Sequence, residues 1–173
     1  MKKYLLLGLI ILTAVGISGC LLTGQITIVK AVDTGLTTNS QIYSYWLDLN
    51  TNSDYADNKD KLKSVDAVSF VAKIKNNAAL ANAAELYIYH DDDLTTVAEI
   101  RDEAIPVLIT PSIAAGDSLL IHWNESFQYM QNLDSLIHYV KDVGAFAVYG
   151  IADTTPFSDS IQAEIVVTFT VGK

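Results

Sequence analysis

The sequence contains few of the residues on which most catalytic and metal sites depend. It has one cysteine, three histidines and nine glycines among 173 residues. A single cysteine excludes an intramolecular disulfide and a multi-cysteine metal centre. The glycines form no phosphate-binding or dinucleotide-binding loop, and no Gly-x-Ser-x-Gly, Ser-x-x-Lys or His-Glu-x-x-His motif occurs. We therefore predict a protein that is not an enzyme.

Positive charge is also scarce. Eleven lysine and arginine residues face twenty acidic residues, which gives a formal net charge of -9, and Arg101 is the only arginine. Such a surface repels nucleic acid and anionic lipid headgroups, and it offers almost no guanidinium groups for phosphate recognition. We expect no nucleic-acid partner.

The first residues follow the order of a secretory signal. Lys2 and Lys3 precede an apolar run that extends from Leu5 to about Ile17, and Ser18, Gly19 and Cys20 follow. The apolar run is shorter than the ~20 residues that a membrane-spanning helix needs. We predict a signal peptide at residues 1–19, with ordinary cleavage elsewhere and a retained anchor as the alternatives.

This ordered pattern resembles the signal of bacterial lipoproteins. The resemblance implies that Cys20 becomes the mature N-terminus and carries several acyl chains, palmitate among them, which anchor the protein in the membrane of the cell envelope. In a host with two membranes, Leu21 after the cysteine implies the outer membrane. Removing residues 1–19 leaves 154 residues and changes the net charge to -11. We divide these into a tether at 20–25 and a single domain at 26–173.

Period-two alternation of apolar and polar residues predicts eight strands in this domain. In residues 161–171, Ile165, Val167 and Phe169 share one face, while Gln162 and Glu164 lie on the other. Residues 65–75 repeat the pattern, with Ser69, Lys73 and Lys75 outward. The other strands are predicted at 26–32, 41–49, 84–90, 105–109, 117–123 and 144–151.

One segment has helical spacing instead. Leu133, Leu136, Ile137 and Val140 recur every three or four residues, Asn132 can cap the start, and Gly144 can end the last turn. The predicted fold is therefore mainly β, a two-sheet sandwich of about eight strands with one short helix at 132–143 that crosses an open end.

The order of these elements resembles that of immunoglobulin-like envelope domains. It is also similar, over residues 65–171, to the water-stress domains of late embryogenesis proteins, although Asn76-Asn77-Ala78 stands where those domains have Asn-Pro-Asn. Both resemblances imply a fold and carry no activity.

An acidic segment at 48–60 is a candidate calcium site. Asp48, Asn50, Asn52 and Asp54 place side-chain oxygens at alternate positions, as in the opening of an EF-hand loop. Ser53 and Lys59 replace the glycine and the glutamate that an EF-hand needs, so we predict a weaker calcium loop between strands. The alternative is a solvated turn. Calcium is the candidate cofactor of this chain; zinc at His90 beside Asp91, Asp92 and Asp93 is a weaker alternative, because no further histidine or cysteine is at hand.

Aromatic residues are candidates for binding a protein or a glycan. Tyr87 and Tyr89 alternate with Leu86 and Ile88 in a predicted strand, so we expect the tyrosines to face outward. Packing of the aromatic residues in the core is the alternative.

These features together predict a non-enzymatic lipoprotein of the cell envelope that acts as a structural or binding module. The second hypothesis is a calcium-stabilised adhesion or glycan-binding domain, and the third is a small hydrolase that uses His90 or His122. Because the tether is short, we expect the partner, a protein or a glycan, to lie at the membrane.

Overall fold

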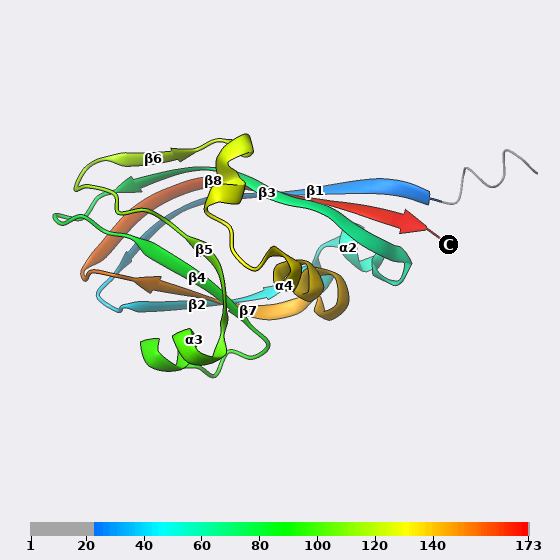
Figure 1. Cartoon of the computed structure of the whole chain (residues 1–173), viewed down its shortest axis with the longest axis horizontal. Coiled ribbons are helices and arrows are strands. Elements are labelled where there is room, and N and C mark those ends of the chain that lie inside the picture. The colour runs from blue at the N-terminus through cyan, green and yellow to red at the C-terminus, as the bar shows by residue number, and fades with distance from the viewer. Residues whose placement is uncertain (1–22, 173) are drawn as a thin grey trace, which may run out of the picture.

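The computed structural model describes residues 23–172, so the signal peptide and Cys20 lie outside the described residues. Eight strands form two antiparallel four-stranded sheets, with the strand orders β1-β8-β3-β6 and β2-β7-β4-β5 (Figure 1). The strands are β1 (Thr23–Thr38), β2 (Ile42–Asp48), β3 (Leu62–Asn76), β4 (Ala84–Tyr89), β5 (Ile105–Ile109), β6 (Ser118–Ile121), β7 (Ala145–Ala152) and β8 (Phe157–Gly172). The predicted two-sheet sandwich is confirmed, and each of the eight predicted strands has a counterpart.

The strand order identifies which kind of sandwich this is. β1 pairs with β8 in one sheet, and β2 pairs with β7 in the other, so the chain winds as two nested Greek keys. This is the jelly-roll arrangement. It shares the two-layer architecture of immunoglobulin-like domains and differs from them in strand order.

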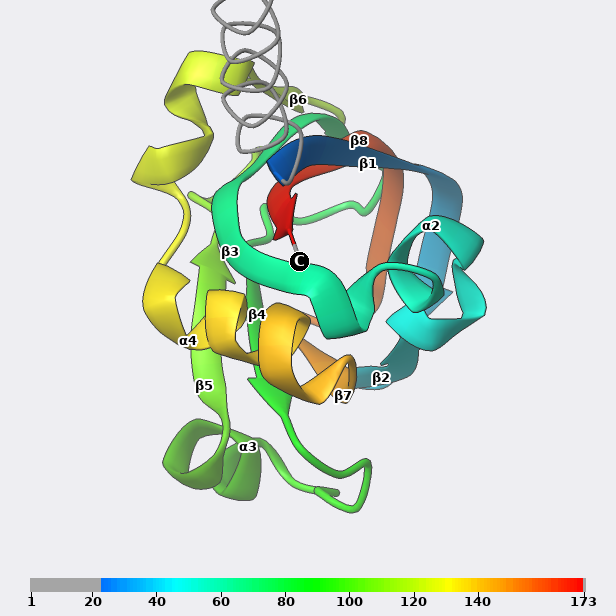
Figure 2. The same cartoon turned by 90° about the vertical axis from the view of Figure 1, so that its right-hand side faces the viewer.

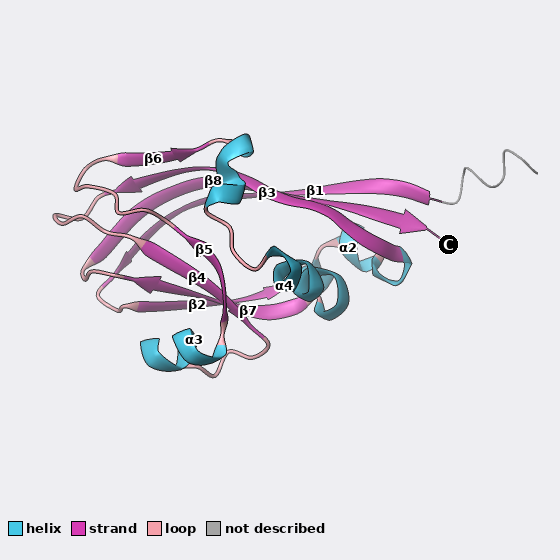
Figure 3. Cartoon of the chain, in the orientation of Figure 1, coloured by secondary structure: helices cyan, strands magenta, loops and turns pink. Residues whose placement is uncertain are grey.

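Short helices lie at the ends and on one face of the sandwich (Figure 3). They are η1 (Leu49–Thr51), α2 (Ser53–Ala56), η2 (Lys59–Lys61), α3 (Val97–Glu103), η3 (Trp123–Gln128), α4 (Leu133–His138) and the π-helical η4 (Tyr139–Val143). α4 and η4 confirm the predicted helix at 132–143, and Gly144 takes the predicted left-handed conformation after it (φ 77°). Asn132 precedes α4, but its side chain donates to the carbonyl of Pro106 (2.9 Å) instead of capping the helix. Within residues 23–172, no helix is long and apolar enough to span a membrane.

The main core lies between the sheets, toward the end that α2 and α4 close (Figure 2). Val68 and Phe169 from one sheet meet Ile88 and Phe146 from the other, and Tyr55 of α2 packs edge-on against Phe169. A second cluster lies on the opposite face of β4 and β7, where α3 contributes Ile100. The sheet β2-β7-β4-β5 is therefore covered on both faces near α3.

Candidate functional site

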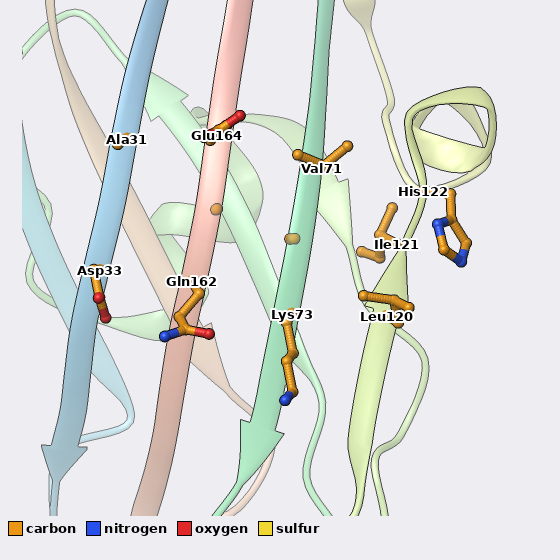
Figure 4. A pocket seen from close by; sticks show the side chains of 11 residues that line it. Ala31, Asp33, Val71, Lys73, Leu120, Ile121, His122, Gln162 and Glu164 are labelled. Carbon is orange, nitrogen blue, oxygen red and sulfur yellow. The ribbon is translucent and has the colours of Figure 1, made fainter.

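A shallow hollow of about 390 Å³ crosses the outer face of the sheet β1-β8-β3-β6 (Figure 4). All four strands of the sheet contribute to it. Its polar side chains are Asp33 from β1, Gln162 and Glu164 from β8, Lys73 from β3 and His122 at the end of β6. Val71 and Leu120 supply apolar surface.

Strand register brings these residues together. Lys73 is paired with Gln162 on one side and Leu120 on the other, and Gln162 is paired with Asp33. This gives one row across the sheet, and Val71, Glu164 and Ala31 form the next row (Figure 4). The intervening positions, such as Ala72 and Ile121, are buried in the core, so the two rows point outward.

The polar groups of the hollow are free to bind a ligand. Within residues 23–172, the side chains of Asp33, Lys73, Gln162 and Glu164 form no hydrogen bond with another protein group, and the ion pairs are made by other residues. The rows offer two carboxylates, one amide and one ammonium group on an exposed surface. Such a set can bind a ligand with several hydroxyl or amide groups through paired hydrogen bonds.

The helix η3, which follows the hollow residue His122, carries two exposed aromatic side chains. His122 is the N-cap residue of η3, and the backbone N–H of His122 donates to the Glu125 carboxylate (3.3 Å), which stabilises the start of this helix. Trp123 is 45% exposed and Phe127 is 54% exposed, although both are large and apolar. Two exposed aromatic side chains therefore belong to the helix that begins directly after a residue of the hollow.

The predicted calcium residues have structural roles in short helices. Asp48 caps η1 by accepting from the backbone N–H of Asn50 (2.9 Å), and Asn52 caps α2 by accepting from that of Tyr55 (3.1 Å). The side-chain oxygen of Asn50 accepts from the ammonium group of Lys59 (3.0 Å). Asp54 is exposed, and its backbone carbonyl accepts from Asn58. Within residues 23–172, no group of three His, Cys, Asp or Glu residues has a metal-binding arrangement. The calcium site stays a prediction.

Tyr55 connects this acidic segment to η4. Its hydroxyl donates to the carbonyl of Val140 (2.7 Å), and the tyrosine is 3% exposed. Burial raises the pKa of Tyr55, and the carboxylates of Asp142 and Asp48 add to this increase. The buried contact fixes α2 against the helix that closes the end of the sandwich.

Tyr87 and Tyr89 lie in different environments. Both point away from Leu86 and Ile88, as predicted, but Tyr87 is 6% exposed because α3 covers this face of the sheet. The expectation that Tyr87 faces solvent is therefore wrong. Its hydroxyl donates to Glu85 (2.6 Å), which also pairs with Arg101 of α3 (2.7 Å). Tyr89 is half-buried and bonds to Glu103 (3.1 Å).

The three histidines lie in three separate environments. His90 packs against the ring of Tyr89 (4.1 Å), and His138 bonds to Asp142 (2.8 Å). His122 lines the hollow. In the part of the chain that the structure describes, no serine, threonine or tyrosine hydroxyl bonds to a histidine ring.

Sequence reasoning identified part of the hollow without recognising it as a site. Lys73, Gln162 and Glu164 were predicted to face outward from their strands, and this is confirmed. Asp33 lies beyond the first predicted strand, which ends at residue 32, whereas β1 continues to Thr38. β1 is longer than predicted because it stays paired with the long strand β8 as far as Thr38. The pattern of a single strand does not show this pairing.

No family model and no curated protein matches the sequence. Among solved structures, one of Desmodium yellow mottle tymovirus has a TM-score of 0.38 at 7% identity, covering 87% of this chain and 89% of that one. One of turnip yellow mosaic virus has a TM-score of 0.38 at 12% identity, with coverages of 87% and 82%. Dimeric latent PorU from Porphyromonas gingivalis has a TM-score of 0.40 at 10% identity, with coverages of 88% and 13%. At these scores and identities, the neighbours carry no inference about the function of this chain.

Proposed function

We propose that this protein is a lipid-anchored, non-enzymatic binding module of the cell envelope. The ordered signal that ends at Cys20 supports the anchor. The outer face of the sheet β1-β8-β3-β6 is the binding surface. In a host with two membranes, the anchor is in the outer membrane.

The observation that carries the binding role is the hollow with its free polar groups. Asp33, Gln162 and Lys73 stand in one cross-strand row, and Glu164 stands in the next. None of them is engaged in stabilising the domain through a hydrogen bond within residues 23–172. These four side chains can therefore bind a ligand without breaking a hydrogen bond that stabilises the folded domain.

The ligand class that this surface favours is a glycan. Hydroxyl groups of a sugar pair well with carboxylate, amide and ammonium groups, and the apolar face of a sugar ring packs on exposed aromatics such as Trp123. The net charge of the chain disfavours strongly anionic polymers. We therefore favour neutral glycans over acidic ones.

A binding test uses the full chain purified in detergent, with dextran and isolated peptidoglycan sacculi as probes. Lys73→Ala and Gln162→Ala should each reduce retention by a binding probe about fivefold, the effect of one lost hydrogen bond. Lys75→Ala is the matched control, because Lys75 is an exposed lysine of β3 outside the hollow. Retention that is equal in all three variants would exclude this surface, and no retention by either probe would favour a protein ligand.

The anchor is tested separately. Cys20→Ser should release the protein from the membrane fraction or leave the precursor unprocessed, as measured by fractionation and mass spectrometry. An unmodified wild-type N-terminus at a residue other than Cys20 would contradict the lipid anchor.

A further inference from the structure

The two sheets have four edge strands, and three of them are protected in ways that prevent further pairing. β5 is covered by the segment 129–131, because Ile109 N–H donates to the Tyr129 carbonyl (3.1 Å) and Gln131 N–H donates to the Val107 carbonyl (2.9 Å). β6 has only four residues. β1 carries the exposed charges of Lys30 and Asp33.

β2 is the edge strand that lacks these protections. Its seven residues, Ile-Tyr-Ser-Tyr-Trp-Leu-Asp, contain no charge before the last position. Tyr43 is 47% exposed, Tyr45 is 55% exposed and Trp46 is 41% exposed. Within residues 23–172, β2 pairs with β7 alone. The aromatic side chains therefore surround a free edge.

The hydrogen bonds at the two ends of β2 show which backbone groups are free. The Gln41 carbonyl accepts from Ala152 N–H (2.9 Å), and Leu49 N–H donates to the Gly144 carbonyl (2.8 Å). In an antiparallel ladder, alternate residues bond to the same neighbour, so the odd-numbered residues of β2 bond to β7. Ser44 and Trp46 therefore direct their backbone N–H and C=O groups away from the sheet.

We infer that β2 is a docking edge that receives an extended segment of another protein as a fifth strand of the sheet. Main-chain hydrogen bonds to Ser44 and Trp46 would give affinity, and Tyr43 and Tyr45 would contact alternate side chains of the added segment.

Charge defines the chemistry of this partner segment. Asp48 ends β2, and Asp54 and Asp57 follow in the chain, whereas Lys59 is engaged by the side chain of Asn50 (3.0 Å). The formal net charge of the whole chain is -9. An extended segment in which lysine or arginine alternates with apolar residues complements this surface.

The same geometry disfavours a second copy of this chain as the occupant. Antiparallel pairing of β2 with itself would reverse one copy end to end, and β2 runs along the long axis of the molecule, at one end of which β1 begins (Figure 1). The two N-termini would then lie at opposite ends of the pair. Only two residues separate Cys20 from β1, so two copies paired in this way could not both be anchored through Cys20 in the same membrane while standing end-on. This step rests on the proposed lipid anchor.

Amide hydrogen exchange of the full chain in detergent tests the inference directly. In the free protein, the amides of Ser44 and Trp46 should exchange faster than those of Tyr43 and Tyr45. A synthetic peptide of alternating lysine and valine should slow exchange at Ser44 and Trp46. A peptide of alternating glutamate and valine should bind more weakly.

Two variants make the test specific to β2. Ser44→Pro removes an outward N–H that makes no ladder bond, so it should preserve the fold and weaken lysine-peptide binding about tenfold, while Ser44→Thr retains binding. Trp46→Lys should weaken the lysine peptide and spare the glutamate peptide.

Three results would overturn the inference. The first is that the lysine peptide leaves the exchange rates at Ser44 and Trp46 unchanged. The second is that Ser44→Pro binds this peptide as tightly as the wild type does. The third is that light scattering gives twice the mass of one chain while the same amides are protected, which would identify a second copy as the occupant. The Cys20→Ser fractionation is independent of all three, so a failure of the lipid anchor would be recognised separately.

Discussion

At the scale of single residues, the most constrained polar groups lie at the end of the sandwich opposite α4. Asn76 is fully buried, and its side chain donates to the carbonyls of Leu80 (2.8 Å) and Ile113 (2.9 Å). Asn82 donates to the carboxylate of Asp159 (2.9 Å), which is 3% exposed. Asn76 thus has partners for both amide hydrogens, whereas Asp159 receives one neutral hydrogen bond and no countercharge within residues 23–172. The carboxylate is the costlier group to bury.

Burial raises the pKa of Asp159, and the hydrogen bond from Asn82 only partly opposes this increase. A folded-state pKa above the unfolded value means that the contribution of Asp159 to stability is complete below the unfolded pKa and is lost as pH rises through the folded pKa. Asp159→Asn should therefore be more stable than the wild type at neutral pH and gain little at acid pH. Urea denaturation over a pH series measures this, with Asp117→Asn as the exposed control at the same end. A gain that is the same at every pH would contradict the prediction.

Gly144 provides a second test at this scale. Its φ is 77°, and an added Cβ would lie 2.7 Å from the Tyr55 hydroxyl, which donates to Val140. Gly116 has a similar φ of 79° but open space around it. Gly116→Ala should lower the free energy of unfolding by about 1 kcal/mol, because alanine is strained in the left-handed conformation. Gly144→Ala should lower it by about 1–2 kcal/mol more, because the added methyl group also displaces the Tyr55 hydroxyl from its hydrogen bond. Chemical denaturation gives both values. Equal losses of stability in the two variants would show that displacing Tyr55 does not destabilise the domain.

At the scale of elements, the helices do as much as the strands to determine which surfaces are available. α3 begins with a capping box, in which Thr96 accepts from Glu99 N–H (3.2 Å) and Glu99 accepts from Thr96 N–H (3.0 Å). Arg101 joins the helix to β4 through Glu85. Because α3 is fixed in this way, it buries Tyr87 and leaves the opposite sheet as the open face of the molecule.

The segment 48–60 is the element whose function is most directly testable. If it binds calcium, the melting temperature of the full chain should rise with added calcium at concentrations of about 0.1–1 mM, and Asp54→Ala should abolish the response. Asp48→Asn is the matched variant, because an asparagine preserves the cap of η1 while removing the charge. A wild-type protein that does not respond to calcium would leave Asp48 and Asn52 with their capping roles alone.

At the scale of the whole molecule, the described domain begins very close to Cys20. β1 begins at Thr23, where Thr23 pairs with Gly172 of β8, so Leu21 and Leu22 alone separate Cys20 from the sheet. The predicted tether at 20–25 is thus shorter by three residues. Three extended residues reach at most ~11 Å, so an anchored domain would lie against the bilayer.

This proximity predicts that the partner is embedded in the membrane or lies against it. A Gly/Ser linker of about twenty residues, inserted between Leu22 and Thr23, should weaken photocrosslinking to that partner in intact cells and leave the melting temperature unchanged. The insertion must precede Thr23, since Gly24 already pairs with Val171. The same linker appended after Lys173 is the control. Undiminished crosslinking would show that the short tether does not select the partner.

Local sequence patterns predicted where the strands lie and, for most of them, which residues share a face. Alternation along residues 65–75 and 161–171 placed Lys73, Gln162 and Glu164 outward, because the period of two is a local property of an extended chain. The ordered signal before Cys20 is likewise recognised from the sequence alone, and it lies outside the described residues. The capping pair Thr96 and Glu99 was also a local signal for α3, and it was overlooked.

Which faces remain open, and which residues meet on them, depends on how the elements pack together. The alternation of Tyr87 with Ile88 could not show that α3 would cover Tyr87, because that contact depends on packing between separate elements. Nor could the separate strand patterns show that Lys73 would stand beside Gln162, or that β2 would lie at an edge. Strand neighbours and register are set by the burial of the whole core, so the hollow and the free edge exist only once both sheets have formed.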